Sequence, residues 1–175
     1  MSIKTIFLDR DGVINKEINY LHKIEDFEFI NGVFEACQYL ENLNYKIIIT
    51  TNQSGISRGY YTEIDFQKVT NWMLGQFKIN NIEILDVIHC PHLPSDFCDC
   101  RKPKPGMLLT AKTKHNIDMK KSWMIGDKEN DIKAANNAGV TNTILVKSGH
   151  NVDEFKTNAK FILDSIKDIH QAINK

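Results

Sequence analysis

Two aspartates stand one residue apart at the end of an apolar run near the N-terminus. The run Ile6–Leu8 is continuous rather than alternating, which predicts a strand buried on both faces. Asp9 and Asp11 follow it, and Gly12 indicates that the backbone turns sharply there. Ligands of open α/β sheets bind beyond the carboxyl ends of the strands, so these carboxylates are candidates for chemistry. A solvated turn at a strand end would use the same residue types.

Polar residues also follow other predicted strands. The segment Tyr45–Thr51 ends in hydroxyl groups and leads into Asn52, while Ser122–Asp127 ends in an acid. Because the carboxyl ends of parallel strands lie at one edge of a sheet, residues far apart in the sequence should gather there. The residues expected at this edge are Asp9, Asp11, Thr51, Asn52, Lys102, Asp127 and Asp131.

Three or four carboxylates gathered in one place require a cation. They would repel one another strongly unless a positive ion neutralised them. Hard oxygen ligands favour Mg²⁺, which usually keeps several waters and accepts an oxygen from a substrate phosphate. Asp131 also has a structural explanation, because a carboxylate in the first turn of a helix interacts favourably with the helix dipole. The acidic cluster therefore predicts a magnesium site.

Two further polar segments could contact a substrate. The loop Asn52–Tyr60 offers hydroxyl and amide donors together with Arg58, and these groups suit a phosphate or a sugar. The same residue types also make plain turns. In Arg101–Gly106, two prolines stiffen a basic segment, which could aim a fixed cation into a site. A solvated basic turn is the alternative, and Lys104 can be explained in that way.

Cysteine and histidine cluster in the segment Cys90–Cys100. Cys90, His92, Cys98 and Cys100 match a closed Cys3His tetrahedral zinc site. Four protein ligands leave no open position for water, so the zinc would be structural. Incidental free thiols are the alternative. His89 is a spare candidate, but its backbone belongs to the predicted strand. The remaining histidines stand alone in the sequence and are expected at the surface or in packing: His22, His115, His150 and His170.

The predicted elements alternate between strand and helix. The strands are Ile6–Leu8, Tyr45–Thr51, Ile82–His89, Ser122–Asp127, Thr143–Val146 and Phe161–Leu163. Helical spacing of apolar residues follows Gly32, Thr62, Met107 and Asp131, and again occupies Ile166–Ile173. This order predicts a mainly parallel sheet with right-handed crossovers and helices on both faces. We expect a Rossmann-like three-layer α/β/α sandwich forming a single domain over residues 1–175.

Composition excludes several classes of partner. The 175 residues are 42% hydrophobic and 25% charged, and 22 basic residues balance 22 acidic residues. No global charge attracts nucleic acid or an anionic membrane, and no apolar run approaches the ~18 residues that span a bilayer. Cysteines clustered beside a histidine suit a reducing compartment. We expect a cytoplasmic monomer that acts on a small molecule, without nucleic acid or membrane as partner.

Four motifs together resemble the haloacid dehalogenase (HAD) superfamily phosphatases. They are DRDGV at Asp9–Val13, the strand-end Thr51, Lys102 before Pro103, and GDxxxD at Gly126–Asp131. The segments TNQSGISRG and CPH…CDCRKPKPGM further resemble the D-glycero-D-manno-heptose 1,7-bisphosphate 7-phosphatase family, to which a histidinol-phosphate phosphatase branch is related. The resemblance runs from about Ile3 to Lys147 and leaves no room for a large cap domain.

The resemblance implies a role for each matching residue. Asp9 would be the nucleophile that forms an aspartyl-phosphate, and Asp11 would be the general acid and base, protonated at the start. Thr51 and Lys102 would hold the phosphoryl oxygens. Mg²⁺ would bind Asp9, the backbone carbonyl of Asp11 and Asp127, with Asp131 orienting these ligands. The substrate contacts would be Asn52, Arg58, Arg101 and Lys128, and Zn²⁺ would bind Cys90, His92, Cys98 and Cys100.

The implied reaction is Mg²⁺-dependent hydrolysis of the C7 phosphate of the heptose bisphosphate, in the synthesis of nucleotide-activated heptose for lipopolysaccharide or another surface glycan. The alternatives are a histidinol-phosphate phosphatase, a receiver-like domain and a zinc-stabilised binding module. The zinc loop is as short as in the histidinol-phosphate branch. Arg10, on the opposite side of an extended backbone from its neighbours, is expected to point away from the phosphate.

Overall fold

A six-stranded parallel sheet organises the computed structural model, which describes residues 2–174. The strand order is β3-β2-β1-β4-β5-β6, and every neighbouring pair is parallel. The strands are β1 (Thr5–Leu8), β2 (Lys46–Asn52), β3 (Ile84–Cys90), β4 (Trp123–Gly126), β5 (Asn142–Val146) and β6 (Phe161–Leu163). The predicted parallel sheet is confirmed, and no large cap domain is inserted between residues 2 and 174.

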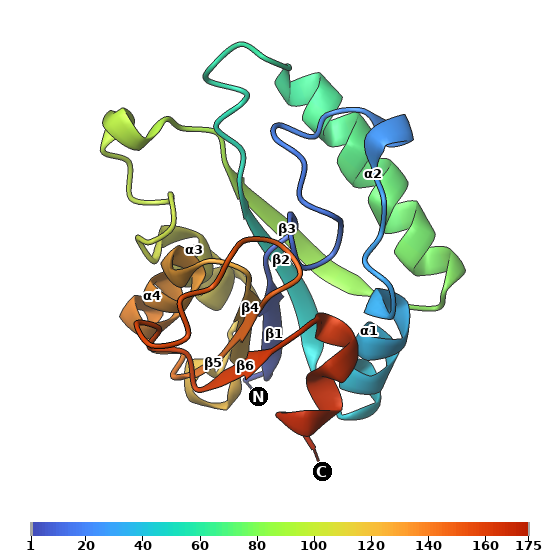
Figure 1. Ribbon diagram of the computed structural model, residues 1–175, viewed down its shortest axis with the longest axis vertical. Coiled ribbons are helices and arrows are strands. Elements are labelled where there is room, and N and C mark those ends of the chain that lie inside the picture. Colours follow the sequence, from blue (N-terminus) through green and yellow to red (C-terminus); the bar gives the residue numbers. More distant parts are fainter. Residues whose placement is uncertain (1, 175) are drawn as a thin grey trace.

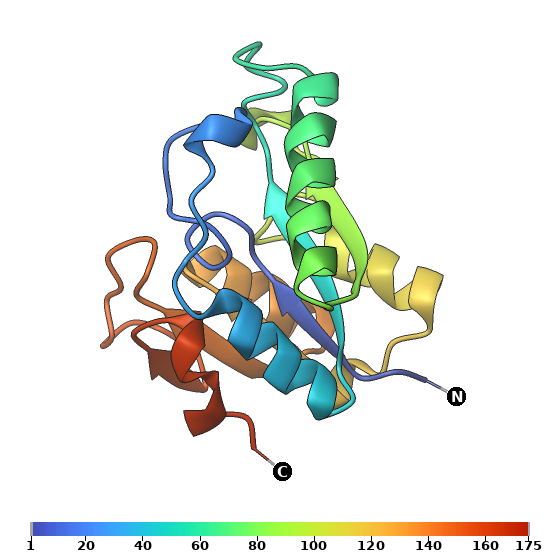
Figure 2. The same ribbon diagram turned by 90° about the vertical axis from the view of Figure 1, so that its right-hand side faces the viewer.

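Helices cover both faces of the sheet, as Figures 1 and 2 show. They are α1 (Val33–Asn42), α2 (Glu63–Ile79), α3 (Gly106–His115) and α4 (Glu129–Ala138). In β1, Ile6 and Leu8 pack into the core shared with α1 and α2, whereas Phe7 packs into the core shared with α3 and α4. Successive side chains of a strand point to opposite faces, so a central strand needs apolar residues at every position. The continuous run in the sequence has this cause.

Two helix boundaries are marked by capping contacts. The Thr62 side chain accepts from the backbone N–H of Asp65, and the Asp65 carboxylate accepts from the backbone N–H of Thr62, which is a capping box. Gly139 ends α4 with a φ of 89°, in the left-handed region that favours glycine. Each boundary was recognisable because it depends on residue types next to each other in the sequence.

The terminal helix differs from its prediction. The sequence pattern predicts a helix over Ile166–Ile173, and the structure forms a 3₁₀ helix over Ile166–Gln171. Its two buried residues, Ile166 and Ile169, lie three positions apart. Residues at this spacing align along a 3₁₀ helix, so a single apolar row can pack on α1 without a full α-helical face.

The carboxyl ends of the parallel strands open on one edge of the sheet. Figure 1 shows the loops after β1, β2 and β3 rising on the same side. This edge therefore receives residues from loops that are distant in the sequence. No helix within residues 2–174 has the length and apolar character needed to cross a membrane.

Candidate active site

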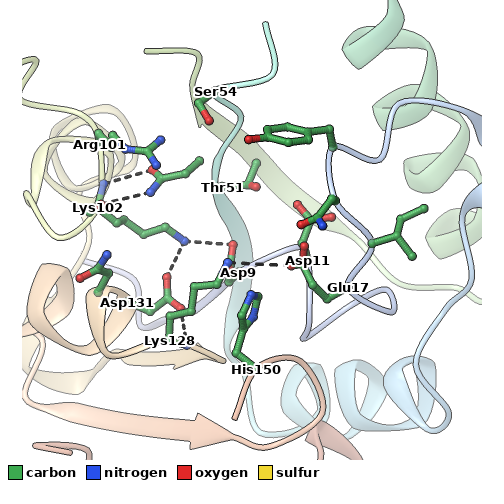
Figure 3. Close-up of a pocket in the computed structure, with 15 residues that line it drawn as sticks. Asp9, Asp11, Glu17, Thr51, Ser54, Arg101, Lys102, Lys128, Asp131 and His150 are labelled. Atoms are coloured by element: carbon green, nitrogen blue, oxygen red, sulfur yellow. Dashed lines mark hydrogen bonds and ion pairs between the residues drawn. The ribbon is translucent and has the colours of Figure 1, made fainter. Parts of the chain in front are cut away.

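A polar pocket of about 230 Å³ lies at the carboxyl edge of the sheet. Its lining comes from the loops after β1, β2, β3, β4 and β5 (Figure 3). The lining residues are Asp9, Asp11, Glu17, Ile18, Asn19, Tyr20, Thr51, Asn52, Ser54, Arg101, Lys102, Lys128, Asn130, Asp131 and His150. The pocket thus brings together most of the residues that the sequence nominated.

Asp9 and Asp131 share one buried cation. Lys102 is 3% exposed, and its Nζ lies 3.0 Å from Asp9 Oδ1 and 2.7 Å from Asp131 Oδ1 (Figure 3). The same Nζ donates to the backbone carbonyl of Thr50 at 2.8 Å. Burial alone would lower the pKa of Lys102, but the two carboxylates raise it above its usual range. The lysine is therefore a permanent positive charge held at a fixed place.

Asp9 presents two unlike oxygens. Its Oδ1 accepts from the backbone N–H of Arg10 at 2.8 Å and from Lys102, so this oxygen is fixed. The other oxygen stays available to the pocket. Burial raises the pKa of Asp9 to about 6, against the opposing influence of Lys102. Ionisation at neutral pH thus depends on keeping a positive charge beside it.

Asn52 holds the backbone of Lys102 through both ends of its amide. Its Oδ1 accepts from the Lys102 backbone N–H at 3.1 Å, and its Nδ2 donates to the Lys102 carbonyl at 3.1 Å. The amide is thereby committed to the protein, so Asn52 positions the lysine in this structure, whereas a substrate contact was predicted.

Arg10, which was predicted to point away from the phosphate, is not among the residues that line the pocket, and its guanidinium contacts Asp11. It is 1% exposed, and its Nη2 and Nε donate to Asp11 Oδ1 at 2.9 and 3.2 Å. Its Nη2 also donates to the Leu21 carbonyl at 3.3 Å. Alternation in an extended strand was the basis of that prediction, and it did not foresee the contact with Asp11, which lies next to the turn at Gly12, where φ is 87°.

Asp11 is surrounded by donors. Besides Arg10, Asn15 Nδ2 donates to its Oδ1 at 3.0 Å, and Gln53 Nε2 donates to its Oδ2 at 3.0 Å. Burial raises the pKa of Asp11, but the charge and hydrogen bonds of these donors outweigh burial and hold the pKa below its usual value. This conformation favours the ionised form, whereas the resemblance implies that Asp11 is protonated when the reaction starts.

A metal fits beside Asp127. Carboxylate oxygens of Asp9, Asp127 and Asp131 lie within 4.8 Å of one another, and Asp127 is 1% exposed. Its Oδ1 is buried without a hydrogen-bond partner among the described residues. Burial and the neighbouring acids raise the pKa of Asp127 to about 9. A hard cation would satisfy the orphaned oxygen and remove the repulsion, and an all-oxygen donor set suits Mg²⁺.

Glycine makes room for this carboxylate. A Cβ added to Gly12 would lie 2.3 Å from Asp127 Oδ2, and one added to Gly149 would lie 2.1 Å from the same atom. The loops after β1 and β5 therefore approach the acid more closely than any side chain would permit. These two glycines explain how three loops converge at the cation site.

The predicted zinc ligands come together beside the pocket. Cys100 Sγ lies 2.9 Å from Cys90 Sγ and 3.5 Å from Cys98 Sγ, and His92 Nδ1 lies 3.2 Å from Cys100 Sγ. Atoms bound to one tetrahedral zinc at about 2.3 Å would stand about 3.7 Å apart, so small adjustments accommodate the ion. His89 lies outside the cluster, with its Nε2 2.9 Å from Glu63 Oε1.

The other predicted substrate contacts are placed differently. Arg101 and Lys128 line the pocket, and Arg101 Nη1 donates to the His92 carbonyl at 3.3 Å, which ties it to the zinc loop. Arg58 is not among the lining residues of the pocket. Its guanidinium lies 5.9 Å from the ring centroid of Tyr20, which does line the pocket. Arg58 therefore contacts a lining residue, Tyr20, but does not itself line the pocket.

Two titratable lining residues, Glu17 and His150, were not predicted from the sequence to be in the site. His150, expected at the surface or in packing, places its Nδ1 2.6 Å from Asp127 Oδ2. Glu17 lies near Asp127 and His150, and burial raises its pKa to about 7. No motif identifies either residue. The position of His150 after a parallel strand, however, was a usable signal, because that loop must open on the same edge of the sheet as Asp9.

Comparisons with known proteins agree with this geometry. Residues 99–169 match the HAD-hydrolase-like family model. The D-glycero-alpha-D-manno-heptose-1,7-bisphosphate 7-phosphatase of Campylobacter jejuni is 50% identical over 172 residues, covering 96% of this chain and 98% of that protein. The corresponding beta-named phosphatase of Escherichia coli K12 is 42% identical, covering 99% of this chain and 95% of that protein.

A solved structure gives the same result for the fold. The D,D-heptose 1,7-bisphosphate phosphatase from B. bronchiseptica, complexed with magnesium and phosphate, superposes with a TM-score of 0.85. It is 25% identical to this chain, and the match covers 97% of both chains. Both the sequence similarity and the fold similarity therefore extend over nearly the whole length.

Proposed function

The chain belongs to the D-glycero-D-manno-heptose-1,7-bisphosphate 7-phosphatases of the HAD-like hydrolases, and from this membership we propose how its pocket performs the reaction. It is a phosphoric monoester hydrolase that removes the C7 phosphate and leaves heptose 1-phosphate. The observation that carries the proposal is a buried Asp9 fixed through one oxygen by Lys102, beside the orphaned oxygen of Asp127.

Asp9 is the proposed nucleophile. Its free oxygen attacks phosphorus, an aspartyl-phosphate forms, and the bond from phosphorus to the C7 oxygen breaks. The departing alkoxide takes a proton from Asp11. In the second step Asp11 accepts a proton from a water molecule that attacks the aspartyl-phosphate, and inorganic phosphate leaves while Asp9 is regenerated. Two steps replace one hydrolysis that is among the slowest uncatalysed reactions known.

Asp11 needs its proton at the first step, although the structure favours its ionised form. A bound phosphate anion is a like charge close to Asp11, and a like charge raises the pKa of a carboxyl group. We infer that the bound phosphate of the substrate raises the pKa of Asp11, so that Asp11 is protonated when the reaction starts. The Arg10 contact then suits the second step, in which an ionised Asp11 is needed.

Thr51 and Lys102 support the transferring phosphoryl group. Both line the pocket, and both are nearly fully buried. Donors fixed in a site that excludes water stabilise developing charge without reorganising during the reaction. Because Asn52, Asp131 and the Thr50 carbonyl hold Lys102, the cation need not be recruited from solvent when the substrate binds.

The cofactor is Mg²⁺, and the residues present fit it. Asp9, the backbone carbonyl of Asp11 and Asp127 would hold the ion, while Asp131 keeps Lys102 and the start of α4 in place. When bound, Mg²⁺ neutralises phosphoryl charge and orients the phosphate. The Cys3His cluster binds a structural Zn²⁺, because four protein ligands leave no open position for chemistry.

Substrate recognition falls to the outer part of the pocket. Arg101 and Lys128 are cations that line it without being committed to Asp9, and they suit the second phosphate and the sugar hydroxyls. We further infer a monomer located in the cytoplasm. The balanced charge and the cysteines gathered at one metal site support that inference.

Phosphate release from competing substrates tests the function. Protein purified without chelator and supplied with Mg²⁺ is given each anomer of the heptose 1,7-bisphosphate and, separately, histidinol phosphate. We expect kcat/KM for the better anomer to exceed that for histidinol phosphate by about 100-fold or more, because unpaired polar groups in a specific site strongly penalise a wrong substrate. The reverse ranking would favour the histidinol-phosphate alternative.

A further inference from the structure

Gln53 connects two residues that act on the phosphate. Its Nε2 donates to Asp11 Oδ2 at 3.0 Å and to Thr51 Oγ1 at 2.8 Å. Gln53 is 3% exposed and is not among the residues that line the pocket, so it acts from behind them. One amide nitrogen has two hydrogens, and both are used here.

Tyr61 determines which way the Gln53 amide faces. The Tyr61 hydroxyl donates to Gln53 Oε1 at 2.5 Å, and Tyr61 is 5% exposed. Burial raises the pKa of Tyr61 to about 12, so the phenol keeps its proton. If the amide were reversed, its oxygen would face the Asp11 carboxylate, and two acceptors would lie in contact.

The packing around Tyr61 shows that its place is built into the fold. A Cβ on Gly55 would lie 2.1 Å from a ring carbon of Tyr61, so the ring occupies space that only glycine leaves. The ring also stacks on His22, with centroids 5.3 Å apart and planes 5° apart. Loops from both sides of the pocket therefore hold the phenol.

We propose that Gln53, oriented by Tyr61, is a positioning residue. It turns the Thr51 hydroxyl toward the phosphate and holds the Asp11 carboxylate at a fixed position relative to that hydroxyl. A hydroxyl that accepts from Gln53 has its own hydrogen free, and no described residue accepts from Thr51 Oγ1. That hydrogen can then donate to a phosphoryl oxygen. This inference rests on the proposed function of Thr51 and Asp11.

Removing the Tyr61 hydroxyl should loosen this arrangement without emptying the core. In Tyr61→Phe the Gln53 amide can reverse, and the Thr51 hydroxyl can then donate to Gln53 Oε1 and not to the phosphate. We expect kcat to fall by about 10-fold with KM little changed, which is the scale of one hydrogen bond. In Gln53→Leu both donors are lost, and we expect a fall of about 100-fold or more.

A matched control is available in Tyr39. Its hydroxyl donates to the Ile173 carbonyl at 2.9 Å, and neither residue lines the pocket. Tyr39→Phe removes a tyrosine hydrogen bond of the same kind, so it should lower the melting temperature as much as Tyr61→Phe does while leaving kcat unchanged. A purely structural role for Tyr61 would make the two variants behave alike.

The deciding experiment measures orthovanadate binding to the Mg²⁺-loaded protein, together with kcat. Vanadate adopts the five-coordinate geometry of phosphoryl transfer, so its affinity reports the donors around phosphorus whatever the natural substrate is. We expect the Kd to rise about 10-fold in Tyr61→Phe and not in Tyr39→Phe. Equal vanadate affinity in the two variants would overturn the proposal. Weakened vanadate binding by a protein that does not hydrolyse the heptose bisphosphate would leave this proposal standing and reject the proposed function.

Discussion

Asp9 and Asp11 are separated by one residue and lie in opposite electrostatic environments. Burial raises the pKa of Asp9 to about 6, whereas Arg10 and the surrounding donors outweigh burial at Asp11 and keep its pKa low. Carboxyl groups whose environments push their pKa values apart can divide nucleophilic and proton-transfer roles. The sequence could assign these roles only by resemblance, because the environment depends on Lys102 and Gln53, which are distant in the chain.

At this scale the first prediction concerns Asp9→Asn. The amide cannot form the acyl phosphate readily, so we expect kcat to fall by a factor on the order of 10⁴ or more. The protein should remain folded, since one of three crowded negative charges is removed and Lys102 keeps Asp131 as a partner. Turnover measures the predicted fall in kcat, and the melting temperature measures whether the variant remains folded. Asp164→Asn, which alters an exposed carboxylate, is the control. Near-normal turnover by Asp9→Asn would reject the nucleophile assignment.

The second prediction links Mg²⁺ to pH. Burial raises the pKa of Asp9 to about 6 and that of Asp127 to about 9 in the metal-free protein. A raised carboxyl pKa stabilises the folded state at low pH, and this contribution is lost as the pH rises through the folded-state value. The free energy of unfolding of the metal-free protein should therefore fall as the pH rises from 6 to 9, because the ionised acids repel one another.

Mg²⁺ binds the ionised carboxylates, so the increase in melting temperature on adding Mg²⁺ should grow over the same pH range. Thermal unfolding with and without Mg²⁺, at constant zinc, measures this increase. In Asp127→Asn the pH dependence should flatten, because one titrating ligand is gone. If Mg²⁺ raised the melting temperature equally at pH 6 and at pH 9, the result would contradict the proposed cation site.

At the scale of elements, the zinc loop and β2 share the task of placing Lys102. Cys100 precedes Arg101 and Lys102 directly, while Asn52, at the end of β2, holds the Lys102 backbone through two hydrogen bonds. The lysine is thus fixed from two sides, and its ammonium group is further held by the Thr50 carbonyl. Loss of one support should leave the other in place.

The third prediction follows from this division. Cys98→Ser should release zinc and lower the melting temperature by about 5 °C or more, because metal binding at a closed site contributes folding free energy. We expect kcat of the folded variant to change less than its stability, since Asn52 and Asp131 still hold Lys102. Metal analysis of the unmodified protein should give about one zinc per chain. An unmodified protein without zinc would contradict the assignment.

The elements that could be predicted from the sequence are those whose signals are local. Continuous apolar runs predicted β1, β2 and β4, and local capping residues mark the start of α2 and the end of α4. The terminal segment was predicted as a helix, but the sequence did not show that it is a 3₁₀ helix, because apolar residues spaced three apart fit either helix type over so short a length. Local patterns therefore determine where elements lie better than they determine their geometry.

At the scale of the whole molecule, sheet topology creates the site. Parallel strands in the order β3-β2-β1-β4-β5-β6 place the loops after β1, β2, β4 and β5 on one edge, where Asp9, Thr51, Asp127 and His150 meet. The acidic cluster could be predicted because each acid follows a recognisable strand. His150, the Asn52 amide contacts and the contact of Arg10 with Asp11 could not be predicted, because side-chain partners across loops leave no periodic pattern in one sequence.

The central claim concerns which phosphate this pocket removes, and ³¹P NMR of the product tests it most directly. The Mg²⁺-loaded protein is incubated with heptose 1,7-bisphosphate, and the remaining ester resonance is assigned to C1 or C7. We predict that the C7 resonance disappears, the C1 resonance persists and inorganic phosphate appears in equal amount. Loss of the C1 phosphate, or survival of both esters, would contradict the account.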